Sequence, residues 1–251
     1  MHLTFLGTGT SHGIPVIGCK CNVCRSKNKK NKRSRSSVWI RGTACSILID
    51  TSLDFRNQAL ENNITDVDSI LYTHSHADHL HGLDDVRIFC RGKSIATYGD
   101  SKTLSDIKKR YSYIFRKTQK GGGKPSLELK TIGKNGVKIG EISVIPIPIQ
   151  HGRLKILGYR LNNIAYLTDC SHIPEKSITL LQKLDVLIIG ALRYKKHKTH
   201  FSISEAVEAI ERLSPKRAYL THLCHDIDHD VLLKKLPEKI EPAYDGLEIE
   251  I

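Results

Sequence analysis

Short apolar runs alternate with segments of helical spacing along this chain. The runs are rich in β-branched residues and are bounded by Gly, Asn or Asp, which is typical of buried strands. The strands that they predict are 3–6, 46–49, 137–139, 142–147, 158–161, 164–167 and 186–189. Apolar residues spaced three and four positions apart predict helices over 55–61, 101–109, 174–183, 202–213 and 230–236.

The order of these elements favours an α/β fold. Asp100 or Ser101 and Ser202 are the predicted N-caps, and the segment 202–205 has a capping-box pattern. Strands come in runs with helices between them, which predicts layers in which helices cover the faces of sheets. The glycines at 121–123 predict a mobile loop. With 251 residues and no low-complexity linker, one domain over 1–251 is the simplest organisation.

The composition indicates a soluble protein with a full core. Hydrophobic residues make up 39% of the chain, yet no apolar run approaches the roughly 20 residues of a membrane span. The first seven residues lack the charged lead and the long apolar stretch of a signal peptide. We therefore expect a cytoplasmic protein without a membrane partner. The oligomeric state stays open, and a homodimer is one arrangement that fits.

Three imidazoles and one carboxylate fall within the six residues His74–His79, just after the predicted strand end at 69–72. Neutral His and ionised Asp are the ligand types that hold Zn²⁺, Fe or Mn²⁺. A loop that leaves a strand can turn this cluster onto one point, whereas a straight helix would spread it around its circumference. The segment therefore predicts a metal site rather than a surface loop that happens to be rich in His.

Four further apolar runs each end on one residue that could bind a metal. These residues are Asp50, His151, Asp169 and His222. A single His or Asp after a strand is a weak signal, because it is more often a satisfied surface or core residue. Together with the cluster at 74–79 the four are a strong signal, because a sheet gathers ligands at one edge in this way.

This pattern resembles the metallo-β-lactamase superfamily of binuclear metallohydrolases over nearly the whole chain. The resemblance implies an αβ/βα four-layer sandwich with two divalent metals at one edge. It implies that His74, His76 and His151 hold the first metal and that Asp78, His79 and His222 hold the second. Asp169 would bridge the two metals. Asp50 would anchor the histidine loop by hydrogen bonds without binding a metal.

The resemblance also implies the chemistry. Two neighbouring cations lower the pKa of a bridging water and so supply hydroxide near neutral pH, and Asp78 would orient it as well as bind a metal. The β-lactamases themselves generally carry Cys where this chain has Asp169, which argues against antibiotic hydrolysis. His76 in place of Glu argues against the oxygen-reducing di-iron branch. The ligand set suits Zn²⁺ or Mn²⁺, and Fe is a third option.

Three of the seven cysteines are clustered as Cys19-x-Cys21-x-x-Cys24, a spacing that suits a knuckle around one structural Zn²⁺. A closed tetrahedral site needs a fourth ligand. His225 is the best candidate, Cys224 is the second and Cys45 the third. The alternative is a loop with free cysteines.

Three motifs narrow the resemblance: the Gly-Thr-Gly-Thr-Ser start at 7–11, the Cys element and Thr-His-x-x-His at 221–225. They look like the branch that contains the phosphoribosyl 1,2-cyclic phosphate phosphodiesterase of phosphonate catabolism. This branch implies a structural zinc on Cys19, Cys21, Cys24 and His225. His200 resembles a His that lies near the metals in this branch and in ribonuclease Z. As an imidazolium it would steady a phosphate oxygen or protonate the leaving alkoxide.

The formal charge of +13 is concentrated in a basic loop that continues from the zinc knuckle, the two lying within 19–41. This loop either is simply exposed to solvent or attracts a phosphate-bearing substrate or nucleic acid. The leading hypothesis is a metal-dependent phosphodiesterase acting on a small cyclic phosphate ester such as a phosphoribosyl cyclic phosphate. One alternative is an RNA-processing nuclease of the ribonuclease Z kind. Another, from a different class, is a non-catalytic nucleic-acid-binding module.

Overall fold

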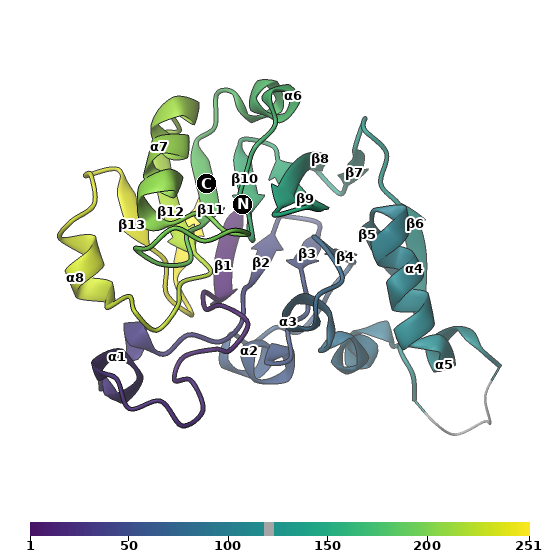
Figure 1. The fold of residues 1–251 in the computed structure, drawn as a ribbon. Helices are drawn as coiled ribbons and strands as arrows, with labels where there is room; N and C mark the ends of the chain where they lie inside the picture. The colour runs from purple at the N-terminus through teal and green to yellow at the C-terminus, as the bar shows by residue number, and fades with distance from the viewer. Residues whose placement is uncertain (118–122) are drawn as a thin grey trace.

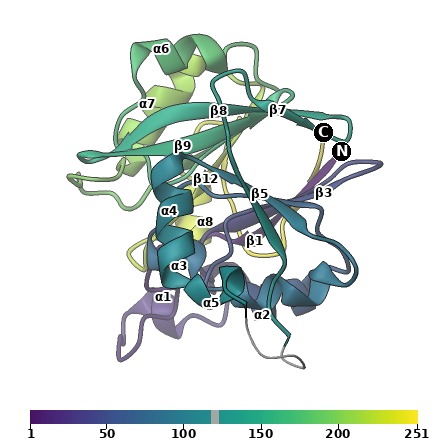
Figure 2. The same ribbon diagram turned by 90° about the vertical axis from the view of Figure 1, so that its right-hand side faces the viewer.

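Two seven-stranded mixed sheets lie face to face in the computed structural model, which describes residues 1–117 and 123–251 (Figures 1 and 2). The first sheet has the order β14-β1-β2-β3-β4-β5-β6, with strands Glu248–Glu250, His2–Gly7, Ser37–Arg41, Ser46–Ile49, Ser69–Leu71, Ile95–Gly99 and Leu127–Thr131. The second has the order β13-β12-β11-β10-β9-β8-β7, with strands Ile240–Pro242, Arg217–Thr221, Val186–Gly190, Ile164–Leu167, Leu154–Leu161, Ile142–His151 and Val137–Ile139.

Helices cover the outer face of each sheet, as Figure 2 shows. The first sheet is covered by α2 (Phe55–Glu61), α3 (Ala77–Leu80), η2 (Leu83–Cys90), α4 (Ser101–Arg110) and α5 (Ser112–Phe115). The second is covered by α6 (Glu175–Ile178), η3 (Thr179–Leu181), α7 (Ile203–Leu213) and α8 (His229–Leu233). The short elements α1 (Asn22–Arg25) and η1 (Lys29–Asn31) belong to the long connection between β1 and β2. The predicted four-layer αβ/βα sandwich is confirmed.

Strand β11 shows why the central strands are apolar throughout. Val186 and Ile188 point into the core between the sheets, whereas Leu187 and Ile189 pack under the helices of the outer layer. All five residues of this strand are buried. A strand covered on both faces reads as a continuous apolar run instead of an alternating one, which is the pattern in the sequence.

The predicted elements agree with the structure within a few residues, with one break. The capping box at Ser202 is present, because its side chain and that of Glu205 each accept a backbone hydrogen bond from the other residue. The predicted helix 174–183 is instead a short α6 followed by the 3₁₀ turn η3. It ends before Lys183, whose φ of 57° is left-handed and ends any helix. Of the predicted glycine loop, 121 and 122 lie outside the described residues.

Parallel pairing brings several strand ends to one side of the molecule. Strand β3 runs parallel to β4, and β10, β11 and β12 run parallel to one another. The carboxyl ends of parallel strands meet at the same sheet edge, so the residues that follow these strands can converge. Among the described residues, no helix is both long and apolar enough to cross a membrane.

Candidate metal centre

Three predicted site residues lie just beyond the ends of strands and turn the backbone sharply. Asp50 follows β3, Asp169 follows β10 and His222 follows β12, with φ values of 63°, 53° and 58°. Left-handed backbone is uncommon outside glycine, although Asp and His adopt it more readily than most residues. Such outliers concentrate at functional sites. Here they place three polar side chains at the ends of buried strands.

The first group of potential ligands is His74, His76 and His151. Each offers one ring nitrogen, and these nitrogens all lie within 4.8 Å of one another. His74 comes from the loop between β4 and α3, His76 is the N-cap of α3, and His151 is the last residue of β8. His74 and His151 are buried and His76 is exposed, so the group is open to solvent on one side.

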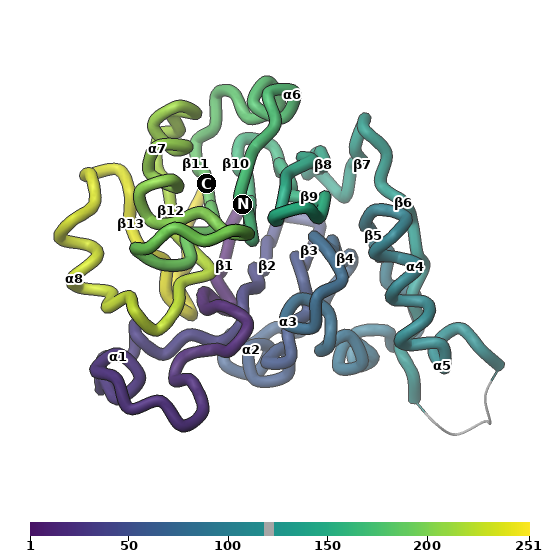
Figure 3. The backbone as a smooth tube through the Cα atoms, viewed as in Figure 1, coloured from purple at the N-terminus to yellow at the C-terminus, as the bar shows by residue number. Residues whose placement is uncertain are grey.

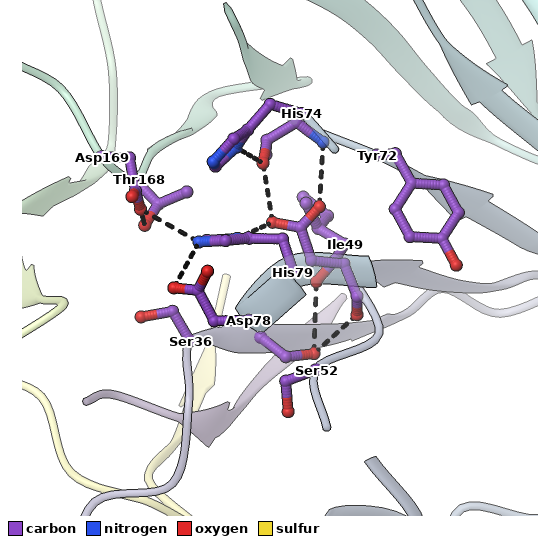
Figure 4. Close-up of polar contacts among 12 residues, drawn as sticks. Ser36, Ile49, Ser52, Tyr72, His74, Asp78, His79, Thr168 and Asp169 are labelled. Atoms are coloured by element: carbon purple, nitrogen blue, oxygen red, sulfur yellow. Dashed lines mark hydrogen bonds and ion pairs between the residues drawn. The ribbon is translucent and has the colours of Figure 1, made fainter. Parts of the chain in front are cut away.

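The second group is Asp78, His79, Asp169 and His222, whose potential ligand atoms also lie within 4.8 Å of one another. Nε2 of His79 lies 3.2 Å from Oδ1 of Asp169 and 3.4 Å from Oδ2 of Asp78 (Figure 4). Nε2 of His222 is likewise 3.2 Å from Oδ1 of Asp169. Because Asp169 also has a carboxylate oxygen within 4.8 Å of His151, it lies between the two groups. The structure thus brings all seven predicted ligands together.

Asp50 is fully buried and does not join either group. It accepts hydrogen bonds from the backbone N–H of Thr73 at 2.9 Å, from the Thr73 hydroxyl at 2.8 Å and from Nδ1 of His79 at 2.7 Å. The bond from His79 holds its proton on Nδ1 and leaves Nε2 for a metal. These contacts match the anchoring role that the resemblance implied for Asp50.

Two other histidines are oriented in the same way by groups that the sequence analysis missed. The Thr73 hydroxyl, which donates to Asp50, accepts from Nδ1 of His74 at 3.0 Å. The carbonyl of Thr199 accepts from Nδ1 of His151 at 2.7 Å. The approach of this carbonyl depends on Gly152 (φ 60°), because a Cβ there would lie 2.7 Å from Cγ2 of Thr199. All three rings therefore offer Nε2 to the centre.

The nitrogens offered in this way fit a metal ion. Nε2 of His74, His79 and His222 is buried in each case and has no hydrogen-bond partner among the described residues. An unpaired buried polar atom is costly, and each one calls for a ligand, an ion or a water. Imidazole nitrogens combined with carboxylate oxygens are ligands typical of Zn²⁺, Mn²⁺ and Fe.

The electrostatics of the centre also suit a cation. Burial alone would raise the pKa of Asp169, but the neighbouring His222 and His79 hold it well below its usual range. Burial alone would lower the pKa of His79, but Asp169, Asp50 and Asp78 raise it well above its usual range. His79 therefore keeps a second proton, on Nε2 beside Asp169 and Asp78, and a bound metal would displace this proton and take over its charge while the proton on Nδ1 stays.

His200 lies beside this centre, as expected, but in a different protonation state. Its ring stacks on His222 with ring centres 4.9 Å apart, and its Nδ1 is 4.0 Å from Oδ2 of Asp169. Burial, and after it the neighbouring His222, lower its pKa to about 3. The expected imidazolium is therefore corrected to a neutral imidazole at pH 7, which can still donate one N–H hydrogen bond to a phosphate oxygen.

The cysteine cluster forms a second group, with His225 as its fourth member. The sulfur atoms of Cys19, Cys21 and Cys24 lie 3.2, 3.7 and 3.7 Å from Nδ1 of His225. Figure 3 shows the knuckle segment around α1 beside the segment that follows β12. The other two candidates for the fourth ligand are wrong, because Cys224 and Cys45 are not part of the group. Three thiolates and one imidazole are a ligand set for structural zinc.

Parts of the basic loop serve the fold and not an incoming ligand. Arg33 is 1% exposed and donates to the carbonyl of Ile227 and to the side chain of Asn31. Arg35 forms an ion pair with Asp54 at 2.8 Å. The expectation of one solvated or ligand-attracting loop is therefore wrong for these two arginines, which fasten the knuckle segment to the sandwich.

Similarity to known proteins defines the class of this protein. A family model described as the β-lactamase superfamily domain matches residues 46–223. The chain belongs to the β-lactamase superfamily. A crystal structure of a diphosphatase from the PhnP family is 40% identical to the chain, with a TM-score of 0.93, and the match covers 100% of this chain and 97% of that one.

A curated relative, named an octanoyltransferase, comes from Porphyromonas gingivalis (strain ATCC BAA-308 / W83). It is 40% identical over 252 residues, which cover 99% of this chain and 51% of that protein, so the chain spans about half the length of this relative. Human tRNase Z, short form, has a TM-score of 0.73 at 19% identity, and the match covers 100% and 99% of the two chains. That identity is low, so the likeness concerns the fold alone.

Proposed function

We propose that this protein is a binuclear metal-dependent phosphodiesterase that hydrolyses a small cyclic phosphate ester, such as a phosphoribosyl cyclic phosphate. The observation that carries the proposal is the position of Asp169 between two groups of ligand atoms. The similarity to a diphosphatase of the PhnP family, which extends over the whole chain, supports phosphorus chemistry. The name of the longer relative belongs to a protein twice this length and adds nothing to the proposal.

In the proposed centre, His74, His76 and His151 would hold the first metal, and Asp78, His79 and His222 would hold the second. Asp169, which lies between the two groups, would contribute to both sites. Two divalent cations would make hydroxide available near neutral pH and stabilise charge on the phosphate. Zn²⁺ and Mn²⁺ both suit these ligands, and Fe is a further option. The cysteine group with His225 would hold a separate structural Zn²⁺.

Two of the chain's residues would act on the reacting groups directly. The carboxylate of Asp78, whose side chain is 13% exposed, can accept a hydrogen bond from the attacking water and orient it. His200 keeps one N–H when it is neutral and can donate it to a phosphate oxygen. Its ring is close enough to the centre to do so, because it lies 4.6 Å from the ring of His151 and 4.9 Å from that of His222. Neither step requires His200 to carry a charge.

The test combines metal analysis with a substrate screen on protein purified without chelator. We expect three metal ions per chain, hydrolysis of bis-p-nitrophenyl phosphate and of cyclic phosphates, and no cleavage of precursor tRNA. In Asp169→Ala we expect hydrolysis to be lost while the zinc on the cysteine group remains. Full activity of that variant would overturn the mechanism.

Two other outcomes would point to the alternative functions. Cleavage of precursor tRNA would favour the ribonuclease Z kind of nuclease, which the tRNase Z fold and the net charge of +13 make a reasonable second candidate. One zinc per chain without any phosphoester hydrolysis would favour the nucleic-acid-binding module.

A further inference from the structure

A groove lies among the helices that cover the outer face of the first sheet, where Figure 2 shows α2. Its volume is about 630 Å³. One wall is α2 with the segment that follows it, and the other is η2 with the segment that follows it. Among the described residues that line the groove, none is a predicted ligand of either metal site. Sites for small molecules are typically about 300 to 1,000 Å³ in size, so the groove is a binding site in its own right.

The floor of this groove is apolar. The side chains of Phe55, Ile64 and Phe89 line it and are buried. The rings of Phe55 and Phe89 meet edge to face with their centres 6.3 Å apart, which joins α2 to η2 at the floor. The floor therefore offers aliphatic and aromatic carbon to a ligand and no polar side chain.

Two large apolar side chains on the walls are open to solvent. Leu60 of α2 is 63% exposed, and Ile88 of η2 is 51% exposed. Single exposed apolar residues are common on protein surfaces. Here two of them line one groove above a buried apolar floor, and a ligand that covers both removes apolar area from water. The walls and the floor together favour a ligand with an apolar body.

The charges around the groove favour an anionic head group on that ligand. The charged residues of the lining are Arg56, Arg87, Arg91, Lys93, Asp66 and Asp85. Lys93 is neutralised by ion pairs with Asp66 at 2.7 Å and Asp68 at 2.9 Å, and Arg87 by one with Asp84 at 3.1 Å. Within residues 1–117 and 123–251, Arg56, Arg91 and Asp85 form no ion pair. The unpaired charges are thus two positive and one negative, and both guanidiniums are exposed.

We infer that this groove binds a fatty carboxylate, with its aliphatic chain on the apolar floor and its carboxylate at Arg56 and Arg91. A small anion would leave Leu60 and Ile88 uncovered, and a neutral hydrocarbon would leave both guanidiniums without a partner. A methylene group is close in size to a water molecule and takes roughly 30 Å³, so a chain of twelve carbons takes about 360 Å³ and fits the groove. The inference concerns a site outside the metal centre and does not rest on the proposed function.

The experiment is a calorimetric titration of the full chain with dodecanoate, kept below the concentration at which it forms micelles. We expect saturable binding. Acetate carries the same head without the chain, and dodecyltrimethylammonium carries the same chain with a positive head. Because each lacks one of the two features that the groove recognises, both should bind about tenfold more weakly or worse.

One pair of variants tests the apolar walls. Ile88→Asp places a carboxylate on the wall and should weaken dodecanoate binding about tenfold or more, since it removes apolar contact and repels the head group. The matched control is Val231→Asp, which changes a 47% exposed apolar side chain of α8 outside the groove and should bind like the wild type. If Ile88→Asp does not fold, Leu60→Asp on the opposite wall carries the same expectation.

A second pair tests the head group. Replacing both guanidiniums, in Arg56→Gln combined with Arg91→Gln, should weaken binding roughly 3- to 10-fold, because ion pairs exposed to solvent contribute little each. Arg25→Gln removes the same charge from the exposed side of α1, outside the groove, and should leave binding unchanged.

Four results would overturn the inference. They are no saturable binding of dodecanoate, equally tight binding of dodecyltrimethylammonium, equal binding in the aspartate variant of the groove and in Val231→Asp, and equal binding in the double arginine variant and in Arg25→Gln. Binding to phosphatidylglycerol vesicles without binding of dodecanoate would also overturn it, in favour of a lipid surface. No step of the titration requires hydrolysis, so the outcome is separate from that of the phosphodiesterase test.

Discussion

Replacing Asp50 with Asn exchanges one oxygen for an NH₂ group at the buried anchor of the metal centre. Asp50 accepts three hydrogen bonds, two from Thr73 and one from Nδ1 of His79. The amide oxygen of Asn can still accept from the backbone of Thr73. Its NH₂ group would then face Nδ1 of His79 and donate to it. This moves the ring proton of His79 to Nε2, the atom that must be free to bind the metal.

The expected effect is a loss of metal affinity at the site of His79 and not a loss of the fold. Removing a partner that orients a metal-binding His typically costs 10- to 100-fold in affinity. This corresponds to about 1.4 to 2.7 kcal/mol. Burial raises the pKa of Asp50, so its ionised form is costly to bury and the neutral Asn avoids that cost. The metal-free variant should therefore remain folded.

The assay is a competition titration with a chromogenic zinc chelator, paired with bis-p-nitrophenyl phosphate hydrolysis over a range of metal concentrations. Activity of Asp50→Asn should recover at a metal concentration 10- to 100-fold higher than in the wild type. The matched control is Asp245→Asn. Asp245 is half-buried and accepts four hydrogen bonds, but from Thr8 and Ser34 and not from a histidine of the centre. Equal metal affinity in Asp50→Asn and the wild type, or an equal loss in the control, would refute the reasoning.

Three further predictions concern the cysteine group, pH and a helix cap. His225→Gln should retain two metal ions per chain instead of three, and metal analysis that still finds three would exclude His225 as a zinc ligand. Burial raises the pKa of Asp245 from 3.8 to about 6, so the folded state holds this proton more tightly. The free energy of unfolding should therefore fall by up to about 3 kcal/mol as pH rises from about 4 to 6. Urea titrations of the wild type and of Asp245→Asn over this pH range would measure the fall. A difference between the two proteins that stays constant with pH would contradict it. Ser202→Ala removes the cap of α7 and should cost about 1 kcal/mol in urea titrations, whereas the exposed Ser204→Ala should cost less than half of that.

The fold was predictable because both of its periodic signals are strong. Strands such as β11 are apolar at every position because helices and a second sheet cover both faces. Helix α7 carries its own start signal in the capping box at Ser202. The break between α6 and η3 was not predictable, because apolar spacing continues through it and the left-handed Lys183 gives no local signal.

Which residues gather at the centre was predictable for a similar reason, since each ends an apolar run or belongs to the cluster at 74–79 that follows one. The protonation and the burial of those residues were not predictable, because they depend on neighbours that are distant in sequence. His200 illustrates this limit. Its position before α7 is visible in the chain, but its lowered pKa follows from burial beside His222, more than twenty residues away. Arg33 similarly reads as one more cation of a basic loop, yet it is buried against the carbonyl of Ile227.

The hydrogen bonds to Nδ1 show why the supporting groups escape a search for motifs. His79 donates to a carboxylate, His74 to a hydroxyl and His151 to a backbone carbonyl. These acceptors are three different chemical groups, and the carbonyl of Thr199 carries no side-chain signature at all. What they share is the ability to accept a hydrogen bond from the Nδ1–H group, which leaves Nε2 of all three rings facing the centre. The arrangement therefore depends on the geometry of the acceptor and not on its residue type, and Thr199→Ser should be neutral as long as the backbone keeps its path beside Gly152.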